Sequence, residues 1–119
     1  MTIAAGFFHR DGILLCADTE HQIGGEFKTH ESKLTEFECV AGRVAFAFAG
    51  NDAFAVSAIE ECERKLKQTS SKDALTVVRA ALDAEYKRIV LTHPEQAFNV
   101  GVHYWLLFAV WQRGCPVKL

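Results

Sequence analysis

The sequence predicts an α+β domain in which two helices cover one face of an antiparallel sheet. The first fifty residues hold short runs of β-branched and aromatic residues broken by turn residues, which is typical of strands. Two stretches with apolar residues at helical spacing follow, and then the apolar run YWLLFAVW. With 119 residues and 50% hydrophobic content, the chain suits a single domain over residues 1–119, or a truncated one, with a real core.

Four strands are predicted before the first helix. Residues 2–8 and 13–18 form a hairpin around the turn sequence HRDG, and KLTEF and RVAFAFAG form two more strands around AGR. The polar, glycine-bearing segment between them, residues 21–32, reads as a loop or a weak edge strand.

Each predicted helix has one apolar stripe that can face the sheet. In the first, over residues 51–68, the stripe is Ala55, Ile59, Cys62 and Leu66. The second lies within residues 69–94, where a serine-containing segment caps its start and it ends before Pro94. Its stripe is Leu75, Val78, Leu82, Tyr86 and Ile89.

Two of the predicted strands raise a difficulty, because VAFAFAG and WLLFAVW are apolar at nearly every position. That pattern indicates a sheet buried on both faces. The two helices cover one face only. We therefore expect a second sheet, from missing chain or from a partner, to cover the other face, which an isolated chain would leave bare.

Composition excludes several classes of function. Lys and Arg number 13 against 15 Asp and Glu, so no basic surplus exists to neutralise nucleic-acid phosphates. No apolar run is long enough to span a bilayer, and the opening lacks the features of a signal peptide, so we expect a cytoplasmic protein with no membrane partner. The cysteines and histidines are scattered without ligand spacing, so no metal is expected, and nothing else in the sequence implies a cofactor.

Thr2 stands directly behind the initiator methionine at the head of the first strand. A threonine hydroxyl is unreactive until a base takes its proton. At a chain terminus the threonine's own α-amine, with a pKa of about 7.7–8.0, can be that base. Removal of Met1 would place Thr2 in this position, although an ordinary strand start explains the same residue.

The surrounding segments resemble a known family. TIAAG with DGILLCADT, then SKL, then VAFAFAGNDAFAVSAIE are similar, in order and spacing, to the β-type subunits of the proteasome core and the bacterial protease HslV. These are N-terminal-nucleophile hydrolases built as a four-layer αββα sandwich. The resemblance is good over about the first seventy residues and looser beyond, and it implies that this chain folds as half of that sandwich.

The resemblance assigns roles to four residues. Thr2 would be the nucleophile and its freed amine the base, Lys33 would supply a fixed positive charge, Asp18 would orient Lys33, and the Gly50 N–H would bind the oxyanion. Each has an ordinary alternative: Asp18 as a strand end, Lys33 as a solvated charge, Gly50 as the turn before a helix.

The chain departs from the family pattern in several places. Glu20 stands where the family usually has Arg, and the Asp18-to-Lys33 spacing is one residue short. The second half of the family's fold, which supplies further active-site groups, has no counterpart before Leu119. While Met1 remains, Thr2 has no free amine.

The resulting hypothesis is a threonine-type peptidase that hydrolyses peptide bonds, with peptides or unfolded proteins as substrates, or a truncated relative of one. The resemblance also implies self-assembly into homo-oligomeric rings. A non-catalytic assembly subunit of such a ring remains an alternative. So does an unrelated small α+β binding domain that uses the polar loop over residues 21–32 as its recognition surface.

Overall fold

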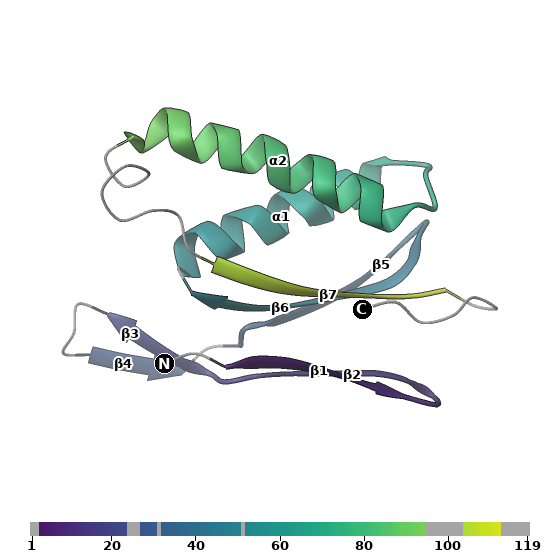
Figure 1. Cartoon of the computed structure of the whole chain (residues 1–119), viewed down its shortest axis with the longest axis horizontal. Helices are drawn as coiled ribbons and strands as arrows, with labels where there is room; N and C mark the ends of the chain where they lie inside the picture. Colours follow the sequence, from purple (N-terminus) through teal and green to yellow (C-terminus); the bar gives the residue numbers. More distant parts are fainter. Residues whose placement is uncertain (1–2, 24–26, 31, 51, 95–103, 113–119) are drawn as a thin grey trace.

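The computed structural model describes residues 3–23, 27–30, 32–50, 52–94 and 104–112. The elements follow in the order β1 (Ala4–His9), β2 (Gly12–Ala17), β3 (Glu20–Ile23), β4 (Phe27–His30), β5 (Leu34–Cys39), β6 (Gly42–Gly50), α1 (Asp52–Gln68), α2 (Ala74–Thr92) and β7 (Tyr104–Trp111). This order of strands, two helices and a strand confirms the predicted α+β class (Figure 1).

The central sheet has three antiparallel strands in the order β5-β6-β7, so β6 lies in the middle. Its register pairs Leu34 with Ala47 and Gly50 with Tyr104. Two hairpins, β1-β2 and β3-β4, form separate two-stranded sheets. The second of them occupies the polar segment that the sequence left as a loop or weak edge strand.

Helix α1 lies on the central sheet through the apolar stripe that the sequence predicts. Ala55, Ile59, Cys62 and Leu66 are all buried. They pack in one cluster with Val44, Phe46 and Phe48, the residues that alternate toward the helices along β6. The predicted face of α1 is therefore confirmed.

Helix α2 packs against α1, and its predicted stripe is partly wrong. Val78 and Ile89 are buried as expected, whereas Leu75 and Tyr86 are exposed. The buried face is rotated and consists of Ala74, Val78, Ala81, Glu85 and Ile89. Small alanines let the two helices approach closely, and a carboxylate bonded across the interface replaces an apolar side chain.

None of the helices in the described residues is long and apolar enough to cross a membrane.

The face of the central sheet away from the helices is covered by the chain's own β1-β2 hairpin (Figure 1). Ile13 and Leu15 of β2 line the space between the two sheets, together with Ala45 and Ala109 of the central sheet. The expectation that this face would be bare in an isolated chain is therefore wrong. Its burial explains why β6 and β7 are apolar on both faces, and it gives three layers: helices, central sheet and hairpin.

The turn between β5 and β6 depends on Gly42, whose φ is +118°. Side chains rarely tolerate this backbone conformation. A Cβ at Gly42 would also lie 2.2 Å from the carbonyl oxygen of Trp111, at the end of β7. The glycine thus allows β7 to run close alongside the start of β6.

Candidate active site

Lys33 comes immediately before β5 and is the largest fully buried side chain of the described residues, 1% exposed. Its Nζ donates a hydrogen bond to Asp18 Oδ1 at 2.7 Å, forming an ion pair. Asp18 follows the end of β2, so the contact joins the hairpin sheet to the central sheet. A buried ammonium needs such a partner, because desolvation strongly disfavours an unpaired charge. The alternative that Lys33 is a solvated surface charge is wrong.

The lysine has a second acceptor in the backbone. Its Nζ donates to the carbonyl oxygen of Glu20 at 2.6 Å. The acceptor belongs to the main chain and not to the side chain. The hydrogen bond to Lys33 can therefore form with Glu20 at this position, where the family usually has Arg. This acceptor was not predicted from the sequence, because every residue type has a backbone carbonyl and no pattern distinguishes this one.

Asp18 is held from two sides. Its Oδ2 accepts a hydrogen bond from the Ile3 backbone N–H at 2.6 Å, while Oδ1 accepts from Lys33. Both contacts favour the ionised carboxylate, and they hold the pKa of Asp18 below its usual value, with the Lys33 bond as the largest cause. The Ile3 contact, also missed from the sequence, ties the start of the first strand to the same carboxylate.

Gly50 ends β6 with a φ of +100°, a conformation that favours glycine. The N–H of Phe48, two residues earlier, donates to the Lys33 carbonyl oxygen at 3.2 Å. The β5-β6 pairing therefore extends through Lys33 and brings the end of β6 to the same end of the sheet. Thr2, the predicted nucleophile, lies outside the described residues, which begin beside it at Ile3.

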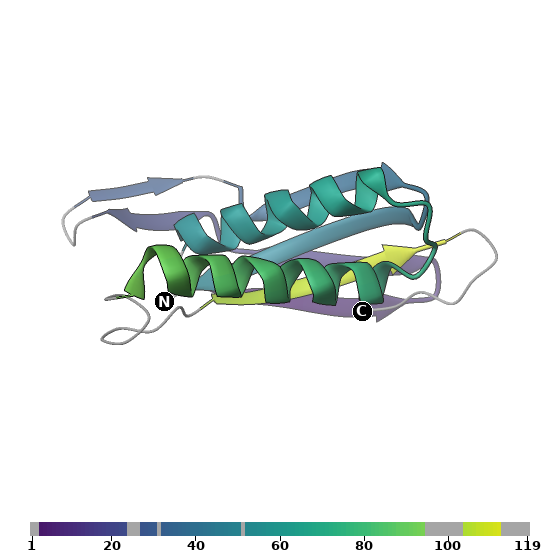
Figure 2. The ribbon, with the colours of Figure 1, turned by 90° about the horizontal axis from the view of Figure 1, so that it is seen from above.

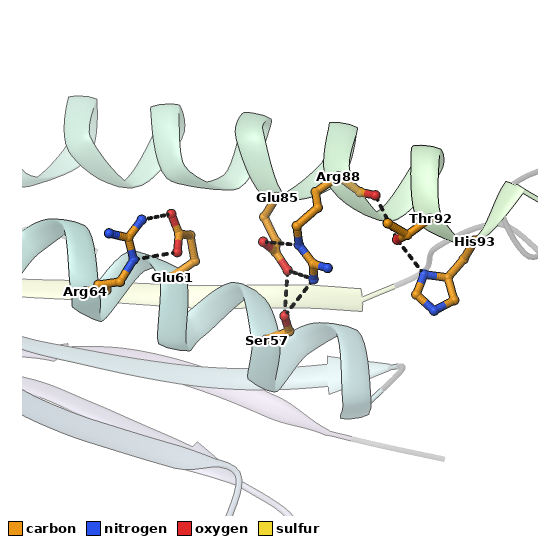
Figure 3. A network of polar contacts seen from close by, with 7 residues as sticks. All are labelled: Ser57, Glu61, Arg64, Glu85, Arg88, Thr92 and His93. Carbon is orange, nitrogen blue, oxygen red and sulfur yellow. Dashed lines mark hydrogen bonds and ion pairs between the residues drawn. The ribbon is translucent and has the colours of Figure 1, made fainter.

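A second polar cluster lies between the two helices. The Ser57 hydroxyl donates to Glu85 Oε1 at 2.5 Å, and the Arg88 guanidinium bonds both the Glu85 carboxylate and the Ser57 oxygen (Figure 3). Glu85 is only 5% exposed. Its pKa is lowered, first by the Arg88 bonds and then by the Ser57 bond. The three side chains all bond to one another, so we interpret the cluster as a structural link between α1 and α2.

No known protein family and no curated protein matches this sequence. Among solved structures, the fold matches a chain of the Anbu complex from Pseudomonas aeruginosa, determined as a helical assembly. The TM-score is 0.75 at 16% sequence identity, and the alignment covers 98% of this chain and 51% of that chain. This chain therefore shares the fold and spans about half the length of its structural neighbour.

These comparisons correct the family assignment. The sequence suggested a β-type proteasome subunit or HslV, yet no family matches and the matching structure is an Anbu complex. That assignment is wrong. The fold class itself is confirmed, and the half-length match agrees with the expectation of half a sandwich.

Proposed function

We propose that this chain is a threonine-type hydrolase that cleaves peptide bonds with Thr2 as its N-terminal nucleophile. The observation that carries the proposal is the ion pair of the buried Lys33 with the partly exposed Asp18, which also accepts a hydrogen bond from the Ile3 N–H before the first strand. Burying a lysine ammonium costs free energy that its bonds to a partner must offset, and carboxylates with a shifted pKa, such as Asp18, cluster at functional sites. The structural match to a protein assembly adds the expectation that the chain works as an oligomer.

The chemistry would proceed in two steps. The free α-amine of Thr2 takes the hydroxyl proton while Oγ1 bonds to the carbonyl carbon of the substrate. The amine then gives that proton to the leaving nitrogen as the C–N bond breaks, which leaves an ester on Oγ1. A water molecule, deprotonated by the same amine, hydrolyses the ester and restores the threonine.

The other three residues would act through charge and position. The Lys33 ammonium stabilises the developing alkoxide and favours the neutral form of the nearby amine. Asp18 would fix the direction of the Lys33 side chain through their ion pair. The Gly50 N–H, at the end of β6, would stabilise the oxyanion of the tetrahedral intermediate.

The test begins with intact mass spectrometry, to establish whether Met1 is removed. The processed chain should hydrolyse peptidyl-aminomethylcoumarin substrates, and acid quenching should trap an acyl adduct that maps to Thr2. Thr2→Ala should abolish both turnover and adduct. Turnover by a chain that retains Met1 would contradict the mechanism, because the amine is then part of a peptide bond.

A matched pair of variants distinguishes the effect of the Lys33 charge on activity from an effect on folding. Lys33→Met keeps the length of the buried side chain and removes its charge, and it should lower kcat at least 100-fold with an unchanged circular dichroism spectrum. Lys67→Met removes an exposed lysine that pairs with Glu63 on α1, and it should leave kcat unchanged. Equal activity of the two variants would remove Lys33 from the mechanism.

A non-catalytic assembly subunit is the second candidate. It is favoured by the alignment, because this chain spans half of a chain whose structure was determined as an assembly. The two functions differ in a simple measurement. An assembly subunit would form large complexes by sedimentation while giving no acyl adduct at Thr2 after Met1 removal.

A further inference from the structure

Strand β7 is an eight-residue edge strand, and within the described residues it pairs only with β6. Its outer edge therefore presents a row of backbone N–H and C=O groups toward the side away from β6. All eight residues, YWLLFAVW, are uncharged. Such an edge is a template for a further strand, because only another backbone can satisfy these groups in a regular ladder.

The opposite edge of the same sheet looks different. Strand β5 carries Glu36 and Glu38, and both carboxylates pair with Arg43 of β6 at 3.2 Å. Charged side chains on an edge strand oppose the addition of another strand. Charged side chains therefore protect the β5 edge of the sheet against strand addition, whereas the β7 edge has no such protection.

A hollow of about 480 Å³ lies beside the β7 edge, beneath α2. It is lined by Leu82, Asp83 and Tyr86 of α2 and by Tyr104, Trp105 and Leu106 of β7. Trp105 is 69% exposed and Tyr86 is 53% exposed, large values for aromatic side chains. The hollow is large enough for several side chains of a neighbouring segment, and its lining is mainly aromatic and aliphatic.

The same hollow accounts for the misplaced stripe of α2. Leu75, Leu82 and Tyr86 recur at helical spacing, so the helix does have a second apolar flank. In this chain Leu75 and Tyr86 of that flank are exposed, while Leu82 is partly buried against the core. The apolar residues on this flank would be buried if further polypeptide packed beneath and beside α2.

We propose that the β7 edge accepts an added, uncharged β-strand from a companion polypeptide, with apolar side chains of that segment entering the hollow beneath α2. The structural match favours a companion, because the neighbour's chain is about twice as long and half of it lies outside the aligned part. A second copy fits poorly. Seen from above, α2 runs over β7 (Figure 2), so two β7 strands paired at about 4.8 Å across a two-fold axis would force their α2 helices together. Packed helices need about 8–10 Å.

The probe is a synthetic peptide, acetyl-KTVTVTVTK-amide, whose valines share one face. Added to the ¹⁵N-labelled 119-residue chain, it should shift the β7 amide resonances and slow their hydrogen exchange at least tenfold. Two control peptides are N-methylated on all valines or on all central threonines, which blocks the N–H groups of one edge or the other. One should lose binding at least tenfold and the other should keep it within threefold.

Side-chain variants test the hollow. Tyr86→Ala should weaken peptide binding at least threefold, while Leu91→Ala, an exposed apolar residue on the same helix outside the hollow, should not. The proposal is overturned if the β7 amides do not respond to millimolar peptide, or if both N-methylated peptides bind equally. It is also overturned if sedimentation shows a dimer that the peptide dissociates, because a second copy would then occupy this edge.

Discussion

The ammonium group of Lys33 and the carboxylate of Asp18 lie 2.7 Å apart across the junction of the two sheets, with the lysine almost fully buried. The pair links a residue that precedes β5 to one that follows β2. Their bond therefore holds the hairpin sheet against the central sheet, and it also holds the Lys33 ammonium in place. The stability of the fold and the proposed chemistry thus depend on one contact.

Replacing Asp18 should change the acid stability of the fold. The pKa of Asp18 is lowered in the folded state from 3.8, chiefly by Lys33 and then by the Ile3 N–H. A lowered pKa means that the stabilisation is present above 3.8 and is lost as the pH falls through the lower, folded value. Asp18→Asn should therefore be less stable than the parent chain near neutral pH, with the difference shrinking below 3.8. Urea unfolding across this range measures it, and a pH-independent difference would contradict the ion pair.

Glu85 should contribute strongly to the stability of the helix pair. Glu85→Ala leaves Ser57 and Arg88 without their shared acceptor and opens a gap between the helices. We expect a loss of about 2–4 kcal/mol in the free energy of unfolding. Asp83→Ala, which removes an exposed carboxylate paired with Lys87 on the same helix, should cost less than about 0.5 kcal/mol. Similar losses for both variants, measured by chemical denaturation, would show that Glu85 is not a structural link.

Gly42 should tolerate substitution worse than Gly12, although each starts a strand after a tight turn. A Cβ at Gly42 meets the Trp111 carbonyl at 2.2 Å, whereas a Cβ at Gly12 has open space. We expect Gly42→Ala to cost about 2–4 kcal/mol, from the backbone conformation and a displaced β7, and Gly12→Ala about 1 kcal/mol. The comparison is made by thermal unfolding. Equal losses would mean that β7 does not run against this turn.

Cys62 should be chemically inert in the folded chain. Burial raises the pKa of its thiol to about 12, and the nearby Glu61 and Glu85 carboxylates add to this effect. Iodoacetamide at neutral pH should therefore label the exposed Cys16 at least 100-fold faster than Cys62. Peptide mapping by mass spectrometry gives both rates in one sample, and denaturant should abolish the difference. Comparable alkylation rates for Cys16 and Cys62 in the folded chain would mean that α1 is not packed on the sheet.

Much of the fold follows from local pattern, because strand runs, turns and the α1 stripe depend on neighbours in sequence. The α2 face does not. Its position depends on how Glu85 is satisfied by Ser57, 28 residues away, and helical periodicity cannot show that a carboxylate will be buried. Likewise, the apolar character of β6 and β7 correctly indicated two covered faces, but not that the N-terminal hairpin would cover one.

Some groups of the candidate site could likewise be predicted from the sequence, and others could not. Asp18 and Lys33 could be singled out from the resemblance, although the family assignment behind it is wrong. The Ile3 N–H and the Glu20 carbonyl, which complete the contacts of that pair, are main-chain groups with no signature in the sequence. The catalytic roles of Thr2, Asp18, Lys33 and Gly50 stay predictions until activity is measured.

The hairpin that covers the central sheet also constrains the order of folding. Strands β1 and β2 emerge first from the ribosome and can pair locally, but β7, part of the surface they cover, follows both helices in sequence. Closing so long a loop is slow compared with forming a hairpin or a helix. The hairpin can therefore meet β5 and β6 before the helices are complete, but the surface it covers is finished only when β7 is in place. Until then part of its apolar inner side is exposed, and we expect the nascent chain to be most prone to aggregation at this stage.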